Sequence, residues 1–144
     1  MQNIKYILLA LLLIVFSCKK DETTPEFRIS LINTTPTSLQ EFQENIRVTI
    51  SYQHPEGFMG FANPDYLSLE INDSRLSNPD YYHLQPLSPP NENISIQGKI
   101  NVEIDAPFCF GNGSSETLTY SLRIQDNKKS WSNTITTTMI TVNK

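Results

Sequence analysis

Apolar residues recur at every second position along most of the chain after residue 26, which is the period of a strand that buries one face. The clearest runs are Phe27, Ile29 and Leu31, then Ile46, Val48, Ile50 and Tyr52, then Leu67, Leu69 and Ile71. The same phase continues in Ile94, Ile96, Ile100, Val102 and Ile104, in Leu118, Tyr120, Leu122 and Ile124, and more weakly in Ile140 and Val142. Six strands are therefore predicted.

A seventh strand is predicted at residues 81–84, where Pro79 and Pro86 restrict it to a short edge element. No segment after Cys18 has the i, i+3, i+4, i+7 apolar stripe of a helix. Short connections favour antiparallel pairing, because a parallel crossover needs about a dozen residues or more. The pattern predicts an all-β, antiparallel sandwich of about seven strands, with a bulge or a close approach at Gly98 and a turn at residues 111–113.

The first 17 residues follow a different pattern. Lys5 precedes an uncharged apolar run at residues 6–16, which is the layout of a secretory signal. A membrane-spanning helix needs about 20 apolar residues, and this run ends at Ser17 before four charged residues at 19–22. Export, rather than a permanent membrane span, is the expectation.

Val15-Phe16-Ser17-Cys18 resembles the lipobox of bacterial lipoproteins. This resemblance implies cleavage of a signal peptide at residues 1–17, a diacylglycerol on the thiol of Cys18 and an acylated amino terminus. The covalent lipid would be the only cofactor, and two or three acyl chains suffice for stable attachment to a membrane. The alternative is an unmodified thiol that follows an ordinary signal.

Residues 18–25 are predicted to be the lipidated cysteine and a flexible tether, because they hold little that a core could bury. The globular domain is expected at residues 26–144. Lys20-Asp21-Glu22 resembles the surface-export signal of Bacteroidota lipoproteins, the alternative being a solvated tether. The expected location is the outer membrane of the cell envelope, with the periplasmic face and the cell surface both left open.

The formal net charge of the chain is −4, and no cluster of basic residues suggests a nucleic-acid partner. Cys109 is the only cysteine besides Cys18, so it has no partner for an internal disulfide once Cys18 carries lipid. A buried thiol between Phe108 and Phe110 is expected, with a bridge between chains or a reactive thiol as the alternatives.

Three stretches, at residues 52–60, 69–75 and 124–133, resemble small Bacteroidota envelope lipoproteins with one immunoglobulin-like or fibronectin-like domain. In that family the first stretch is often an acidic loop that could ligate calcium. Here only Glu56 and the more distant Asp65 remain, whereas calcium takes six to eight oxygen ligands. No metal is expected.

Residue types that perform catalysis are sparse. His54 and His83 are interpreted as solvated loop residues, and no nucleophile motif, phosphate loop or zinc motif is present. Glu103 and Asp105 alternate on one strand and are expected on its solvent face. The chain is therefore predicted not to be an enzyme. A pocket joining His54 or His83 to a carboxylate would favour a third hypothesis, a small envelope hydrolase.

Several aromatic residues lie outside the alternating core pattern: Phe58, Phe61, Tyr66, Tyr81, Tyr82 and Trp131. Exposed rings could stack on sugars or anchor a partner protein. The alternative is that Phe58, Phe61 and Trp131 cap the ends of the sandwich, with Trp131 plugging the core. Asp73 and Arg75 are expected to brace a loop, the alternative being contact with a neighbouring chain.

The leading hypothesis is a lipid-anchored, non-enzymatic binding module that contacts another envelope protein through loops or an open sheet edge. The second is a glycan-binding surface lipoprotein of a polysaccharide uptake system, with Tyr81, Tyr82 or Trp131 as stacking platforms. The sequence leaves the partner and the oligomeric state open.

Overall fold

The computed structural model describes residues 26–57, 59–89 and 92–144. The predicted signal at 1–17, Cys18 and the tether at 18–25 lie outside the described residues, as does Phe58. The described chain folds into ten strands and no helix, which confirms the all-β prediction. Accordingly, these residues contain no helix that could span a membrane.

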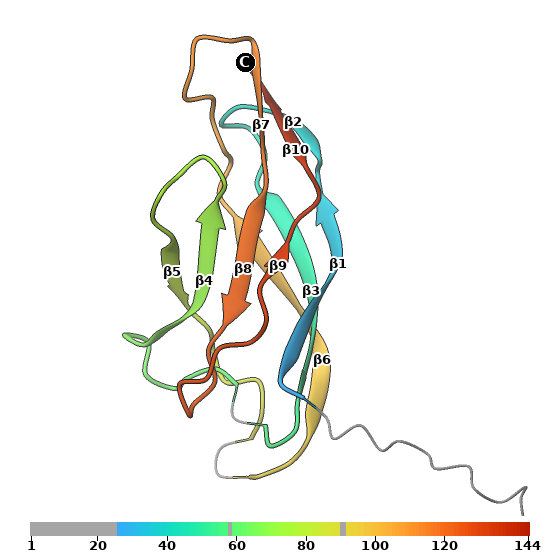
Figure 1. Ribbon diagram of the computed structural model, residues 1–144, viewed down its shortest axis with the longest axis vertical. Helices are drawn as coiled ribbons and strands as arrows, with labels where there is room; N and C mark the ends of the chain where they lie inside the picture. Colours follow the sequence, from blue (N-terminus) through green and yellow to red (C-terminus); the bar gives the residue numbers. More distant parts are fainter. Residues whose placement is uncertain (1–25, 58, 90–91) are drawn as a thin grey trace, which may run out of the picture.

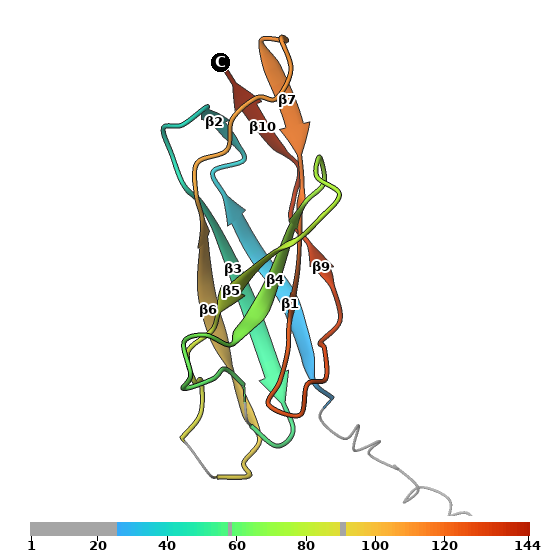
Figure 2. The same cartoon turned by 90° about the vertical axis from the view of Figure 1, so that its left-hand side faces the viewer.

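Two sheets face each other along the length of the domain (Figures 1 and 2). The first has the order β1 (Arg28–Thr35), β3 (Ile46–His54), β6 (Ile96–Ile104). The second has the order β5 (Asp80–His83), β4 (Leu67–Asp73), β8 (Tyr120–Ile124), β9 (Ile135–Thr136). A third sheet, with the order β2 (Ser38–Gln40), β10 (Ile140–Asn143), β7 (Ser115–Leu118), lies at one end of the domain.

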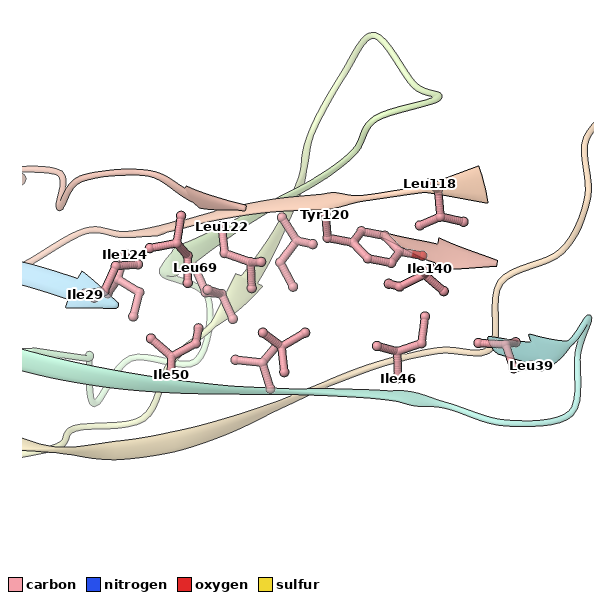
Figure 3. Packing of buried hydrophobic residues seen from close by; sticks show 14 of the residues in the cluster. Ile29, Leu39, Ile46, Ile50, Leu69, Leu118, Tyr120, Leu122, Ile124 and Ile140 are labelled. Atoms are coloured by element: carbon pink, nitrogen blue, oxygen red, sulfur yellow. The ribbon is translucent and has the colours of Figure 1, made fainter. Parts of the chain in front are cut away.

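The alternating residues of the two facing sheets form the core. In β3 the inward positions Ile46, Val48 and Ile50 are fully buried. Figure 3 shows Ile50 opposite Ile124 of β8 and Ile46 opposite Ile140 of β10. Burying one such aliphatic side chain contributes about 1.5–3 kcal/mol, which is why the period-two pattern determines which face of each strand turns inward. The sequence pattern therefore predicts the core correctly.

Several details differ from the predicted strands. The run from Leu118 to Ile124 is interrupted at Thr119, which divides it into β7 and β8. The short β2 carries one buried apolar residue, Leu39, too little for an alternating signal, and its pairing with β10 is parallel. At Gly98 the pairing of β3 with β6 is continuous without a bulge. A Cβ atom there would lie 2.6 Å from the Tyr52 hydroxyl, so the glycine makes room for that side chain.

The two long sides of the sandwich differ. On one side the side-chain amide of Asn133 accepts from the backbone N–H of Ile29 at 2.9 Å and donates to its carbonyl at 3.0 Å, which ties β1 to the segment before β9. On the other side the outer strands β5 and β6 both lack a further strand neighbour in the described chain. The sandwich is thus open between β5 and β6.

Candidate functional site

A groove of about 290 Å³ occupies this open side, where both edge strands and the connection after β6 contribute to its wall. Its floor is apolar, with Ile71 and Tyr120 from the second sheet and Ile104 from the first. Three further rings line it: Tyr82, Phe108 and Phe110. Concave apolar sites with a few polar groups are the usual place for a ligand.

An exposed aromatic cluster adjoins this groove. Phe42 from the β2–β3 loop stacks on Phe108, with ring centroids 5.1 Å apart, and Phe108 meets Phe110 edge-on at 5.1 Å. Phe42 is 68% exposed and has a φ of 64°, a left-handed conformation that costs a bulky residue about 1–2 kcal/mol. Phe42 therefore combines high exposure with a backbone conformation that such residues rarely adopt.

The loop that carries Phe108 and Phe110 is held firmly by hydrogen bonds. The Glu41 carboxylate accepts from the N–H of Cys109 at 3.1 Å, and the Glu116 carboxylate accepts from the N–H groups of Phe110 and Gly111. These two N–H groups, followed by Arg75, hold the pKa of Glu116 below its usual value. Hydrogen bonds to charged acceptors are strong, so these consecutive N–H groups fix the backbone of the loop. The two exposed rings are therefore carried on a preorganised segment.

Arg75 joins this loop to the second sheet. Its guanidinium forms a bidentate pair with Asp73, from Nε to Oδ1 at 3.0 Å and from Nη2 to Oδ2 at 2.7 Å. The same guanidinium donates to Glu116 at 3.1 Å and to the Phe108 carbonyl at 2.7 Å. It also lies 4.1 Å from the centroid of the Phe110 ring. The expectation that Asp73 and Arg75 brace a loop therefore agrees with the structure, and the braced loop is the wall of the groove.

The candidate residues Tyr81, Tyr82 and Trp131 do not form one platform. Tyr82 pairs with the inward-facing Leu69 and lines the groove, whereas Tyr81 pairs with the outward-facing Glu70. On that outer face Arg123 is ion-paired with Glu70 at 2.7 Å and stacks on Trp131 at 4.4 Å. The Glu70 carboxylate raises the pKa of Tyr81, and Arg123 lowers the pKa of Glu70. Trp131 is partly exposed and does not plug the core.

A second, more polar hollow of about 480 Å³ lies over the first sheet. Its rim is formed by Arg28, Gln53, Gln97 and Lys99, with Ser30 and Ser51 between them. The only ring in its lining belongs to Tyr52, which packs against the core. The hollow offers hydroxyl, amide and cationic groups together with the single ring of Tyr52.

The interpretation of His54 as a solvated loop residue is wrong. Its side chain is 3% exposed at the end of β3, where it continues the inward phase of Ile46 to Tyr52. Nδ1 accepts from the N–H of Glu56 at 3.1 Å, so Nε2 carries the proton and donates to Asp126 at 3.3 Å. Both side chains of the pair are buried, at 3% and 6% exposure, and neither lines the groove between β5 and β6 or the hollow over the first sheet. It therefore gives no support to the hydrolase hypothesis.

The remaining candidates have structural partners. His83 is half-buried, and its Nδ1 donates to the Tyr66 carbonyl at 3.0 Å, so it is not a solvated loop residue either. Glu56 pairs with Lys128, and Glu103 pairs with Arg47 on the solvent face. Cys109 is a buried free thiol, as expected. In the described part of the chain no group of three or more His, Cys, Asp or Glu could hold a metal ion.

Sequence reasoning misses the aromatic groove. The pattern identifies Phe108 and Phe110 only as the neighbours of Cys109, and it does not single out Phe42. One available signal is the isolated ring in the polar stretch Gln40-Glu41-Phe42-Gln43-Glu44. Comparisons of the chain with protein-family models, with curated proteins and with solved structures found no match.

Proposed function

We propose that this protein is a lipid-anchored, non-enzymatic binding module of the cell envelope that contacts a partner protein through the exposed cluster of Phe42, Phe108 and Phe110. The observation that carries this proposal is the cluster itself. Three rings gather beside a groove on loops held by Glu41, Glu116 and Arg75. Aromatic residues on a preorganised surface are typical anchors of protein interfaces.

The immunoglobulin-like class is part of this proposal. A sheet of three strands, β1-β3-β6, packed against a sheet of four, β5-β4-β8-β9, supports a fibronectin-like arrangement. The start of the chain also pairs with two different sheets: β1 pairs with β3, and β2, which follows it, pairs with β10. This change of sheet is compatible with a fibronectin-like arrangement. Such sandwiches host many functions, so the class adds nothing to the choice of partner.

The position of the cluster fits an anchored protein. β1 begins at the lower end of the domain, whereas the loops after β2 and β6 lie toward the opposite end (Figure 1). An anchor at Cys18 would attach to the lower end. The aromatic cluster would then face away from the membrane, where a partner can reach it.

Changing Cys18 to Ala should abolish lipid attachment. The native protein should partition into detergent, with an intact mass of residues 18–144 plus acyl chains, while the Cys18→Ala variant should lack the acyl mass. Cys109→Ala is the matched control, because it removes the other cysteine and should keep the lipid. An unlipidated native chain in the aqueous phase would refute the anchor.

Changing Phe42 and Phe108 together to Ala should release the partner. Each aromatic anchor contributes about 2 kcal/mol when it is central to an interface, and such contributions are not strictly additive, so the double variant should bind roughly thirtyfold to 800-fold more weakly. The measurement is quantitative co-purification from detergent-solubilised envelopes, followed by affinity measurement with the protein recovered. Trp131→Ala is the control, since that ring is on another face. Equal recovery from all three proteins would contradict the proposal.

The glycan hypothesis is the alternative proposal. The polar hollow over the first sheet supports it, because hydroxyl and amide groups can bond to a sugar. The separation of Tyr82 from Tyr81 and Trp131 counts against it, because a glycan platform needs its rings side by side. The exposed phenylalanine cluster is better suited to a protein surface.

A further inference from the structure

The groove between β5 and β6 combines aromatic walls with an excess of negative charge. Its lining contains three carboxylates, from Asp73, Asp80 and Asp105, and one cation, Arg75. Arg75 is already committed to Asp73, Glu116 and the Phe108 carbonyl. Asp80 and Asp105 form no ion pair with any described residue. Two carboxylates thus remain for a ligand.

These two carboxylates line the same groove as Tyr82, and their charges act on its hydroxyl. Burial, and after it the charges of Asp80 and Asp105, raise the pKa of the Tyr82 hydroxyl. Asp80 comes from β5 and Asp105 directly follows β6, so the two edge strands each bring one carboxylate to the lining of the groove. A cation at this position would be attracted by both charges and by the faces of the nearby rings.

The chain already contains an example of this contact. The Arg75 guanidinium lies over the Phe110 ring at 4.1 Å, inside the same lining. Tyr82 and Phe108 line the same groove, and the rings of both residues are exposed. The groove is therefore suited to a second cation that brings an apolar stem of its own.

We propose that the groove receives a lysine or arginine side chain from the partner protein, with the apolar stem against Ile104, Tyr82 and Phe108 and the charged end between Asp80 and Asp105. This inference rests on the proposed binding function and specifies the chemistry of the partner. Long cationic side chains commonly bury their methylene groups on an apolar surface and keep the charge at its rim.

The size and composition of the groove favour a single side chain over other cationic ligands. Pockets for drug-sized molecules occupy about 300–1,000 Å³, so a volume of about 290 Å³ is at their lower limit. A hard divalent cation prefers six or more oxygen ligands, and the described residues contain no suitable cluster. The overall negative charge of the chain also favours a basic partner surface.

The test uses amino-acid amides and amide NMR shifts of the folded domain. N-acetyl-lysine methylamide and the arginine equivalent should shift the signals of Tyr82, Asp105 and Phe108 at millimolar concentration, and added salt should weaken the effect. N-acetyl-norleucine methylamide has the same stem without the ammonium group. It should bind at least about tenfold more weakly, a difference of about 1.4 kcal/mol.

The protein variant for this test is Asp80→Asn with Asp105→Asn. Both residues are exposed, so the fold should be kept, and lysine amide affinity should fall about tenfold. Asp65→Asn with Glu92→Gln is the matched control, because it makes the same charge change outside the groove and should leave binding unchanged. These outcomes would support the inference.

Three results would overturn it: norleucine amide binding as well as lysine amide, no shift at the groove with any probe, or equal loss of affinity in the control. Each result would reject the proposed cation site but not the aromatic interface. That interface is tested separately by the double variant in which Phe42 and Phe108 are changed to Ala. Failure of the phenylalanine variants to release the partner would instead reject the binding function.

Discussion

Asp126→Ala is expected to lower the free energy of unfolding by about 1–3 kcal/mol. The Asp126 side chain is 6% exposed, and it accepts from Nε2 of His54 at 3.3 Å and from the N–H of Ser130 at 2.8 Å. Its removal leaves the imidazole donor of His54 and the N–H of Ser130 without their acceptor, and an unsatisfied buried donor costs about 1–3 kcal/mol. Urea unfolding followed by circular dichroism would measure the change.

Asp65→Ala is the control, because Asp65 is an exposed loop carboxylate and its loss should change stability by no more than about 0.5 kcal/mol. The combined variant His54→Leu and Asp126→Leu should recover part of the lost stability, since apolar groups of similar size need no hydrogen bonds. A loss below about 1 kcal/mol in Asp126→Ala would show that the pair contributes little to the fold.

His54 also illustrates how far the strand pattern can be trusted. Its position continues the sequence Ile46, Val48, Ile50 and Tyr52, so the phase alone places it inward. The Pro55 and Gly57 that follow it favour a loop instead, and the loop interpretation is the wrong one. Asp126, its partner, is 72 residues away in sequence, and a period-two pattern carries no information about such a pairing. The alternating pattern thus predicts that the His54 side chain is buried, but it cannot predict which polar side chain bonds to it.

The candidate site is harder to predict than the fold for a related reason. Neighbouring residues of a strand point to opposite faces of the sheet, so Tyr81 and Tyr82 must lie on different faces. That these two rings do not form one platform could therefore have been predicted from the sequence. The cluster of Phe42, Phe108 and Phe110 arises from loops brought together by Glu41, Asn45 and Glu116. Loop geometry of this kind depends on individual hydrogen bonds rather than on periodicity, so the sequence pattern does not reveal it.

Arg75→Met is expected to lower the free energy of unfolding by about 3 kcal/mol and to loosen the loop that carries Phe108 and Phe110. The Arg75 side chain is 13% exposed and its partner Asp73 is 9% exposed, so the substitution leaves a carboxylate in a largely buried position without its cation. It also removes the donors to Glu116 and to the Phe108 carbonyl. Thermal unfolding and hydrogen exchange at Phe108 and Phe110 would record the two effects.

Arg47→Met provides the comparison, because Arg47 forms the same kind of ion pair with Glu103 while both side chains are more than half exposed. Exposed pairs contribute about 0–1 kcal/mol, so this variant should remain near the native stability. Arg75→Lys should rescue little, since an ammonium group cannot reproduce the bidentate pair and the contact with Phe110. Equal stability of the Arg75→Met and Arg47→Met variants would contradict the role of Arg75, and the aromatic cluster would then have to keep its arrangement through Glu41 and Glu116 alone.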